Sequence, residues 1–217
     1  QIGVVAVAAG DGLAEVFKSL GVAQIVHGGQ TNNPSTEEIY QAIQDIPTDK
    51  VIVLPNNKNI HLAAEAAANL SPKLVGIVPT RTAPQGFGAM FAFHPDGVLE
   101  DTINEMHEAA QQVSTGQITR ATRSVTLDGV EVEEGQIIGL VDGRLCSSGP
   151  EIQNVLSEVL EGMDVAEREI VSIYYGAEVD EQEAASVAEY IESNYEDVEV
   201  ELLPGGQAHY FFILGAE

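Results

Sequence analysis

The chain lacks tryptophan, has a single cysteine and carries few basic residues for its length. Only 6% of its 217 residues are aromatic, so a hydrophobic core must be built mainly from aliphatic side chains. The single cysteine, Cys146, excludes an internal disulfide and fits a reducing compartment. Nothing near Cys146 in the sequence would activate a thiol, so we do not expect a catalytic cysteine.

Long hydrophobic runs are absent too. No apolar stretch approaches the roughly 18 residues that a membrane span requires. The apolar start at residues 2–9 has no basic flank, so it does not resemble a signal peptide. We therefore expect a cytoplasmic protein without a membrane span. Because Gln1 is not an initiator residue, we also expect the sequence to be part of a longer chain.

The scarcity of bases sets the charge: 34 acidic and 9 basic residues give a formal net charge of −25. Residues 1–110 hold 12 acids and 5 bases, whereas residues 111–217 hold 22 acids and 4 bases. Such a field repels nucleic acids and anionic membranes, so we expect neither as a partner. It would attract a basic protein surface to the second half, although solubility or adaptation to a salty cytoplasm explains the same composition.

The first half alternates apolar runs with helical patterns, which is typical of a parallel sheet covered by helices on both faces. Ser35 and Glu38 form a capping box, which predicts the start of a helix. Residues 81–98 contain prolines and glycines and are predicted to be a connector. Strands are predicted at residues 4–8, 23–26, 51–54 and 74–78. Helices are predicted at residues 12–20, 35–46, 60–70 and 98–113.

The second half shows short alternating strands and Asp-Gly turn signals at residues 128–129 and 142–143. This pattern indicates an α+β subdomain with a mixed or antiparallel sheet. The predicted fold class is therefore α/β with two parts, a parallel-sheet subdomain at residues 1–115 and an acidic α+β subdomain at residues 116–217. Strands are predicted at residues 119–127, 130–132, 136–141, 144–146, 170–175, 199–203 and 210–214. Helices are predicted at residues 151–160 and 180–195.

All four predicted strands of the first half end in polar turns. The carboxyl ends of parallel strands meet at one edge of a sheet, where α/β proteins bind ligands. Helix N-termini at this edge add partial positive charge, so a carboxylate, a phosphate or a polar loop of another protein would fit. Ordinary turns explain the same residue types. The candidate ligand- or partner-binding residues are Gly10, Asp11, Gly12, Gly28, Gly29, Gln30, Thr31, Asn32, Asn33, Ser35, Asn56, Asn57, Lys58, Asn59, Thr80, Arg81, Thr82, Gln85 and Gly86.

Motifs of other chemistries are incomplete or missing. The turn at residues 9–12 lacks the third glycine of a dinucleotide fingerprint, and no Walker motif occurs. Gly-Gly-Gln, the signature of peptide release factors, occurs at residues 28–30 and 205–207, but so acidic a chain lacks their RNA-binding surface. No histidine stands at metal-ligand spacing from another histidine or from the cysteine. We therefore expect no catalytic residue and no metal site. The histidines are His27, His61, His94, His107 and His209.

Four longer runs carry a family resemblance, at residues 5–21, 28–37, 54–60 and 78–86. They closely resemble the C-terminal region of the ATP-binding subunit of bacterial fatty acid kinases, which are dihydroxyacetone-kinase-like proteins, and the resemblance covers essentially the whole chain. In that family a separate N-terminal domain binds ATP and magnesium, so the resemblance implies no cofactor for this chain. It implies two partners: the N-terminal kinase domain, and a DegV-like fatty-acid-binding protein whose bound fatty acid becomes an acyl phosphate.

The same region looks like a distant relative of the DegV proteins. Residues 30–35 resemble the ligand loop of DegV-like proteins, and residues 85–88 resemble their glycine-rich turn. On this resemblance, Thr31 and Ser35 are the nearest counterparts of the hydroxyls that grip a carboxylate. The end of the chain departs from the pattern, because residues 205–212 lack the His-Thr-Gly-Pro-Gly type of loop.

Three functional hypotheses follow. The first is a non-catalytic domain that docks the fatty-acid-binding protein and presents it to the separate kinase domain of a parent phosphotransferase. The second is a small-ligand or fatty-acid-binding module of the DegV type. The third is a dihydroxyacetone-kinase-like enzyme fragment with activity of its own.

Overall fold

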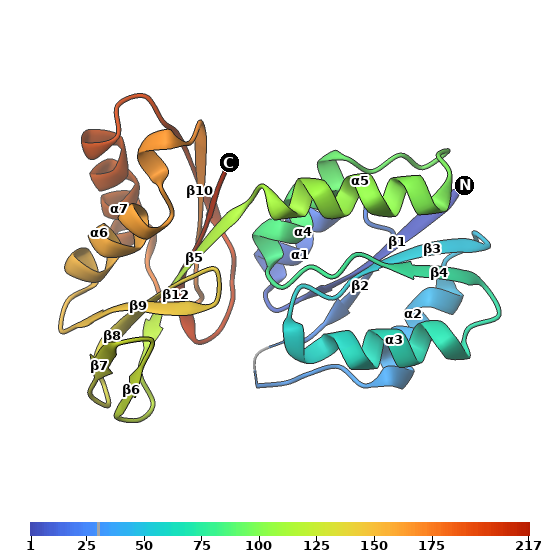
Figure 1. Cartoon of the computed structure of the whole chain (residues 1–217), viewed down its shortest axis with the longest axis horizontal. Coiled ribbons are helices and arrows are strands. Elements are labelled where there is room, and N and C mark those ends of the chain that lie inside the picture. The colour runs from blue at the N-terminus through green and yellow to red at the C-terminus, as the bar shows by residue number, and fades with distance from the viewer. Residues whose placement is uncertain (30) are drawn as a thin grey trace. The chain divides into compact units, whose positions relative to one another are not determined.

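The structure is a computed structural model that describes residues 1–29 and 31–217. The chain divides into two compact units, Gln1–Val113 and Ser114–Glu217, whose helices and strands are labelled in Figure 1. A strand begins at Ser114, so the second unit starts before the predicted subdomain at residues 116–217. The α/β fold class is confirmed, with a parallel sheet in the first unit and a mixed sheet in the second.

The first unit is built on a parallel sheet with the strand order β2-β1-β3-β4. Every neighbouring pair of these strands is parallel, as the apolar runs predict. The central strand β1 is buried along its whole length, because both faces of the sheet are covered. The strands are β1 (Ile2–Ala8), β2 (Gln24–His27), β3 (Lys50–Leu54) and β4 (Leu74–Ile77).

Helices cover the two faces of this sheet in two groups. α1, α4 and α5 lie on one face, and α2 and α3 lie on the other (Figure 1). Aliphatic side chains fill the space between α2 and the sheet, where Ile39 and Ile43 pack in one cluster with Val5 and Val51. The helices are α1 (Asp11–Ser19), α2 (Thr36–Asp45), the short η1 (Lys58–Ile60), α3 (His61–Leu70), α4 (Ala83–Phe91) and α5 (Leu99–Gln111).

Both ends of α2 are held by side chains. The backbone N–H of Glu38 donates to Oγ of Ser35 (3.1 Å), and the N–H of Ser35 donates to the Glu38 carboxylate (2.7 Å), which confirms the capping box. At the other end, Nζ of Lys73 donates to the carbonyl oxygens of Ile43 (2.9 Å) and Gln44 (3.1 Å). A cation at a helix C-terminus also interacts favourably with the helix dipole.

The connector predicted at residues 81–98 contains a helix that the sequence did not indicate, since α4 occupies its first half. Thr82 begins this helix, since its Oγ1 accepts from the backbone N–H of Gln85 (3.2 Å). Pro84 lies in the first turn, where a helix tolerates proline. Two glycines, Gly86 and Gly88, then continue inside the helix, where glycine ordinarily weakens it.

The second unit is built on a sheet with the strand order β11-β10-β12-β5-β8-β9. β10 and β11 are parallel, whereas the other neighbouring strands of this sheet are antiparallel. This mixed sheet confirms the α+β pattern predicted for the second half. Its strands are β5 (Ser114–Arg120), β8 (Ile137–Val141), β9 (Arg144–Gly149), β10 (Ile170–Tyr175), β11 (Glu199–Pro204) and β12 (Tyr210–Ala216).

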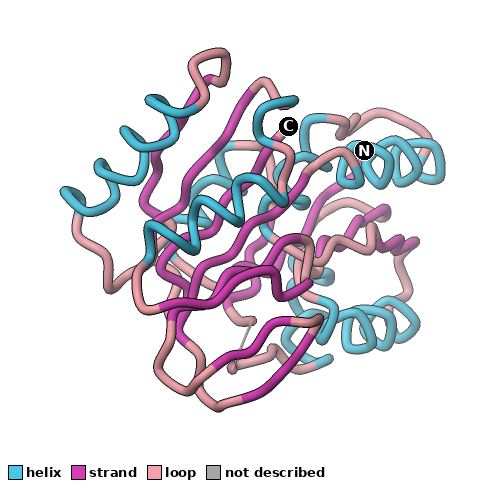
Figure 2. Tube along the Cα trace, turned by 60° about the vertical axis from the view of Figure 1, so that its left-hand side comes forward, coloured by secondary structure: helices cyan, strands magenta, loops and turns pink. Residues whose placement is uncertain are grey.

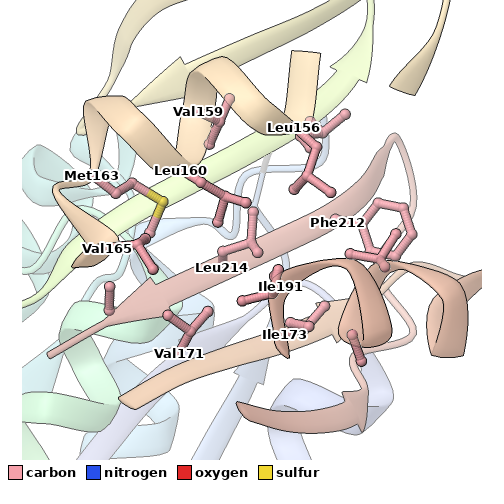
Figure 3. Packing of buried hydrophobic residues seen from close by; sticks show 14 of the residues in the cluster. Leu156, Val159, Leu160, Met163, Val165, Val171, Ile173, Ile191, Phe212 and Leu214 are labelled. Carbon is pink, nitrogen blue, oxygen red and sulfur yellow. The ribbon is translucent and has the colours of Figure 1, made fainter. Parts of the chain in front are cut away.

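Two long helices, α6 and α7, lie on one face of the mixed sheet (Figure 2). Leu156 and Leu160 of α6 and Ile191 of α7 point toward Phe212 and Leu214 of β12, and all five side chains are buried (Figure 3). Within the described part of the chain, no helix is both long and apolar enough to cross a membrane. The helices are α6 (Ile152–Gly162), the short η2 (Val165–Glu167) and α7 (Glu181–Asn194).

Residues 119–127 do not form the continuous strand that their alternation predicts. β5 ends at Arg120, and a separate hairpin follows with β6 (Val125–Leu127) and β7 (Val130–Val132). At the base of this hairpin Ala121 exchanges backbone hydrogen bonds with Gly135 and Gln136, and Nη1 of Arg120 donates to the carbonyl of Gly135 (2.7 Å). The Asp-Gly turn is confirmed, since Asp128 and Gly129 both have positive φ, at 51° and 79°.

Candidate functional site

The polar turns of the first unit lie at one edge of its sheet, because its strands are parallel. β1 and β2 end level with each other, where Ala8 pairs with His27. Gly29 follows β2 and lies against the end of β1, since a Cβ built on Gly29 would be 3.0 Å from the Cβ of Ala9. The ends of β3 and β4 join the same edge through Asn56 and Thr80.

Asn56 connects three strand ends. Its Nδ2 donates to the carbonyl of Val7 in β1 (2.9 Å). The backbone pairing of β1 with β3 ends at Ala6 and Leu54, so this side-chain bond continues the contact between the two strands. Its backbone N–H donates to Oγ1 of Thr80 (3.1 Å), and that hydroxyl donates back to Oδ1 of Asn56 (2.8 Å). Thr80 is only 1% exposed. Asn56 has a φ of 57°, a left-handed conformation that asparagine adopts more readily than most residues.

Gly86 of α4 packs directly on this junction. A Cβ at Gly86 would lie 2.3 Å from Oδ1 of Asn56 and 2.8 Å from Cζ of Phe17. The ring of Phe17 in turn contacts that of Phe87 in a tilted arrangement, with ring centroids 4.4 Å apart and an interplanar angle of 48°. Glycine is therefore required at position 86 because α4 approaches the ends of the strands so closely.

The turn between β4 and α4 is also closed by its own side chains. Oε1 of Gln85 accepts from the backbone N–H of Arg81 (2.8 Å), while Thr82 caps α4. His61 secures the same turn from α3, because its Nε2 lies 2.9 Å from the carbonyl oxygen of Thr80 and donates to it. Sequence reasoning treated His61 as one of several scattered histidines, and only the long-range contact shows its role.

The loop after β2 is tight at its base. Gly29 and Asn32 exchange two backbone hydrogen bonds, at 3.0 and 3.1 Å. Gly28 leaves no room for a side chain, because a Cβ there would be 2.7 Å from the Asn32 carbonyl and 2.9 Å from Cδ of Pro34. Ser35, predicted from resemblance to grip a carboxylate, caps α2. Gln30 was predicted to take part in the site and lies outside the described residues.

The predicted site residues with side chains form two overlapping groups, and Ser35, which caps α2, belongs to both. The side chains of Asn56, Thr80, Thr82 and Gln85 hydrogen-bond within the turns and hold them in shape. Asn57 does the same, since its Oδ1 accepts from the backbone N–H of Asn59 (2.9 Å). Binding by either group stays a prediction. The predicted residues with exposed side chains at this edge are Asp11, Thr31, Asn32, Asn33, Ser35, Lys58, Asn59 and Arg81. The glycines Gly10 and Gly12 flank the start of α1 at the same edge.

The second Gly-Gly-Gln motif is part of the packing of the second unit. Gln207 is 2% exposed, and its Nε2 donates to the carbonyls of Tyr174 (2.9 Å) and Tyr210 (3.3 Å). Its side chain therefore ties the end of β10 to the start of β12. Gly205 must lack a side chain, because a Cβ there would lie 2.0 Å from Oε1 of Gln207. Nothing in this arrangement exposes the amide for chemistry.

Burial raises the pKa of a thiol and of a phenol in the second unit. Burial, together with the charge of Glu158, raises the pKa of the Cys146 thiol and so favours its protonated form. Burial likewise raises the pKa of Tyr174 to about 12. Among the described residues, no group of three or more His, Cys, Asp or Glu side chains is arranged to hold a metal ion.

The sequence matches one protein-family model over residues 3–217, the FakA-like C-terminal domain of fatty acid kinase subunits. Protein YloV of Bacillus subtilis is 38% identical over 215 residues, which are 99% of this chain and 39% of that protein. A Staphylococcus aureus protein is 34% identical over 217 residues, which are 100% of this chain and 40% of that protein. The chain thus spans about two fifths of the length of these curated relatives.

Solved structures share the fold at low sequence identity. A fatty-acid-binding DegV family protein from Thermus thermophilus has a TM-score of 0.67 at 15% identity, with both chains covered completely. The Streptococcus pneumoniae fatty acid kinase B3 protein, loaded with linoleic acid, has a TM-score of 0.64 at 8% identity and covers 100% of this chain and 99% of its own. The dihydroxyacetone kinase of C. freundii has a TM-score of 0.65 at 17% identity, covering 99% of this chain and 47% of that one.

Proposed function

This chain belongs to the FakA-like C-terminal family of fatty acid kinase subunits, and from that membership we propose that it is a non-catalytic docking domain. It binds a DegV-like fatty-acid-binding protein and presents the bound fatty acid to a kinase domain elsewhere in the parent protein. The kinase domain, with ATP and magnesium, then forms the acyl phosphate. The relatives are about two and a half times as long as this chain, which leaves room for such a domain in them.

The observation that carries the proposal is that polar side chains at the strand ends hydrogen-bond within the fold. The side chains of Asn56, Thr80, Thr82 and Gln85 all hydrogen-bond within the fold. A pocket for a small carboxylate would need such groups aimed at the ligand. The network instead makes the turns rigid, which suits a surface that meets another protein without reorganising.

Titration calorimetry with a purified DegV-like fatty-acid-binding protein from the same organism tests the proposal. We expect a saturable one-to-one complex with this chain alone. A second titration, with the fatty-acid-binding protein stripped of lipid, shows whether the Kd of the complex depends on the bound fatty acid. Absence of measurable association at 100 μM, a generous concentration for transient partners, would contradict the proposal.

Binding of a fatty acid or another small ligand by this chain is the second candidate. The fold likeness to DegV-family proteins, several of which were solved with fatty acids, favours it. Native mass spectrometry of the chain purified from cells would then show a bound acid, and a variant Thr31→Ala would lose it. Ser35 is unsuitable for this test, because Ser35→Ala removes the cap of α2 and costs about 1 kcal/mol.

An enzyme activity of the chain itself is the remaining alternative, in the manner of a dihydroxyacetone-kinase-like fragment. It would require ATP-dependent phosphorylation by this chain without the rest of the parent protein. Loss of that phosphorylation on changing Asp11 or Lys58, the exposed charged residues of two strand-end turns, would support it.

A further inference from the structure

Apolar side chains lie exposed along the segment that joins α4 to α5. Phe91, the last residue of α4, is 73% exposed, and Val98, directly before α5, is 64% exposed. Pro95 is exposed between them. We call Phe91, Pro95 and Val98 the connector patch. Single exposed apolar residues are ordinary on a protein surface, so exposure alone does not mark an interaction surface.

The start of α5 departs from the usual chemistry of a helix N-terminus. Val98 takes the N-cap position in an extended conformation, with φ −75° and ψ 132°. Serine, threonine, aspartate or asparagine is preferred there, because a side-chain oxygen accepts from a backbone N–H of the first turn, as that of Ser35 does for α2. Valine has no such oxygen, so α5 is less stable than a capped helix would be. Proteins break local rules of this kind mainly at functional positions.

The backbone of the connector is held in one shape. The N–H of Gly97 donates to the carbonyl of His94 (3.1 Å). Nε2 of His94 lies 3.1 Å from a carboxylate oxygen of Glu105 in α5. Gly97 packs closely on the same helix, since a Cβ there would lie 2.6 Å from Oγ1 of Thr102. The connector patch is therefore presented from a fixed backbone.

The first strand begins beside this patch. The backbone N–H of Ile2, the first residue of β1, donates to the carbonyl of Pro95 (2.8 Å). The N-terminus accordingly lies beside the start of α5 (Figure 1). A polypeptide that continues before Gln1 starts next to Pro95. At about 3.4 Å per residue, five extended residues reach either Phe91 or Val98, which stand four and three positions from Pro95.

We propose that the connector patch is covered by the segment that precedes Gln1 in the parent protein, and that this segment packs apolar side chains on Phe91 and Val98. The family model is that of a C-terminal domain, and the matched region is 39% of Protein YloV, so about three fifths of such a parent lies outside this chain. A packed segment restricts how the preceding domain turns relative to the first unit. The inference rests on family membership and is independent of the docking function.

The size of the connector patch favours a tethered occupant. A stable interface between separate proteins buries about 800 Å² on each partner, which is more than three side chains supply. A segment joined to Gln1 by a few residues has an effective concentration at the patch in the millimolar range, so a small apolar contact holds it. A second copy of the chain has no such tether, and two molecules that each carry a net charge of −25 repel each other.

Hydrogen exchange of the intact parent protein, compared with that of the isolated chain, tests the inference. Peptides that cover residues 89–98 should exchange at least fivefold more slowly in the parent, because the preceding segment shields the connector from water. Peptides that cover the hairpin of β6 and β7 serve as the control and should change less than twofold.

A double variant of the parent, Phe91→Lys with Val98→Ser, removes the apolar side chains without harming the helices. Serine is a favoured N-cap residue for α5, and lysine in the last turn of α4 interacts favourably with the helix dipole. The isolated chain with both changes should therefore melt no lower than the wild type. In the parent, protease cleavage of the segment before Gln1 should become at least fivefold faster. The control Leu127→Lys, which removes a 53% exposed leucine from β6, should change cleavage less than twofold.

Equal exchange of residues 89–98 in the parent and in the isolated chain would overturn the inference, and so would cleavage that the double variant leaves unchanged. Shielding that appears only after the DegV-like fatty-acid-binding protein is added would assign the connector patch to that protein. A dimer of the isolated chain that the double variant abolishes would assign it to a second copy. Either assignment also overturns the inference. A failure of docking leaves the exchange and cleavage comparisons intact, because neither requires the fatty-acid-binding protein.

Discussion

Replacing Asn56 by alanine tests the rigid strand-end junction. The change removes the bond from Nδ2 to the Val7 carbonyl and the acceptor for the Thr80 hydroxyl, at about 1 kcal/mol each. Alanine also tolerates the left-handed φ of 57° less well than asparagine, which adds about 1 kcal/mol. The expected loss is about 3 kcal/mol, or roughly two orders of magnitude in the opening equilibrium of the first unit.

Native-state hydrogen exchange read by mass spectrometry measures this loss where it occurs. Peptides from β1, β3 and β4 should exchange faster in Asn56→Ala, while peptides from the second unit serve as an internal control. Asn56→Gly loses the same side-chain bonds without the backbone strain, so it should be less destabilised than the alanine variant. Asn59→Ala, an exposed amide in the next turn, should change little. A change below about 0.5 kcal/mol in Asn56→Ala would refute the reasoning.

Three further variants test the packing around this edge and in the second unit. Gly86→Ala should destabilise the first unit by about 1–3 kcal/mol in thermal unfolding, because the added Cβ would lie 2.3 Å from Oδ1 of Asn56. Replacing glycine by alanine in a helix usually raises the melting temperature, and such a rise here would contradict this reasoning. Lys73→Met removes the hydrogen bonds from Nζ to the last carbonyls of α2, at a cost of about 1–2 kcal/mol, so amide hydrogen exchange in the last turn of α2 should become faster. Unchanged exchange would show that water replaces these bonds. The pKa of about 12 for Tyr174 exceeds the unfolded value near 10, so the unfolded chain ionises first and stability falls as pH rises from 10 to 12. Urea unfolding of Tyr174→Phe should show a smaller fall over that range, and an equal fall would exclude Tyr174 as its cause.

The parallel sheet of the first unit was predictable because its signals are local. A buried central strand needs apolar residues throughout, and β1 supplies them from Ile2 to Ala8. The capping box at Ser35 fixes the start of α2 with two side chains three residues apart. Turn signals at Asp128 and Gly129 work in the same way, since the turn type itself demands positive φ.

α4 was missed because its glycines have a long-range cause. Gly86 and Pro84 indicate a loop when only neighbouring residues are considered. In the structure Gly86 packs against Asn56, thirty positions earlier in the chain, and no local pattern reveals that contact. The roles of Asn56 and Gln207 were hidden for the same reason, because each donates to a carbonyl of a strand far away in the sequence. The sequence placed Asn56 among binding residues, and the structure adds that its side chain joins the strand ends.

The docking account is tested most directly by competition in the acyl phosphate reaction of the parent kinase. The isolated chain, added in excess over the parent protein, should capture the fatty-acid-binding protein and inhibit acyl phosphate formation. The inhibition should saturate as the isolated chain reaches the concentration of the fatty-acid-binding protein, and further fatty-acid-binding protein should relieve it. Unchanged acyl phosphate formation in the presence of a large excess of the chain would contradict the account.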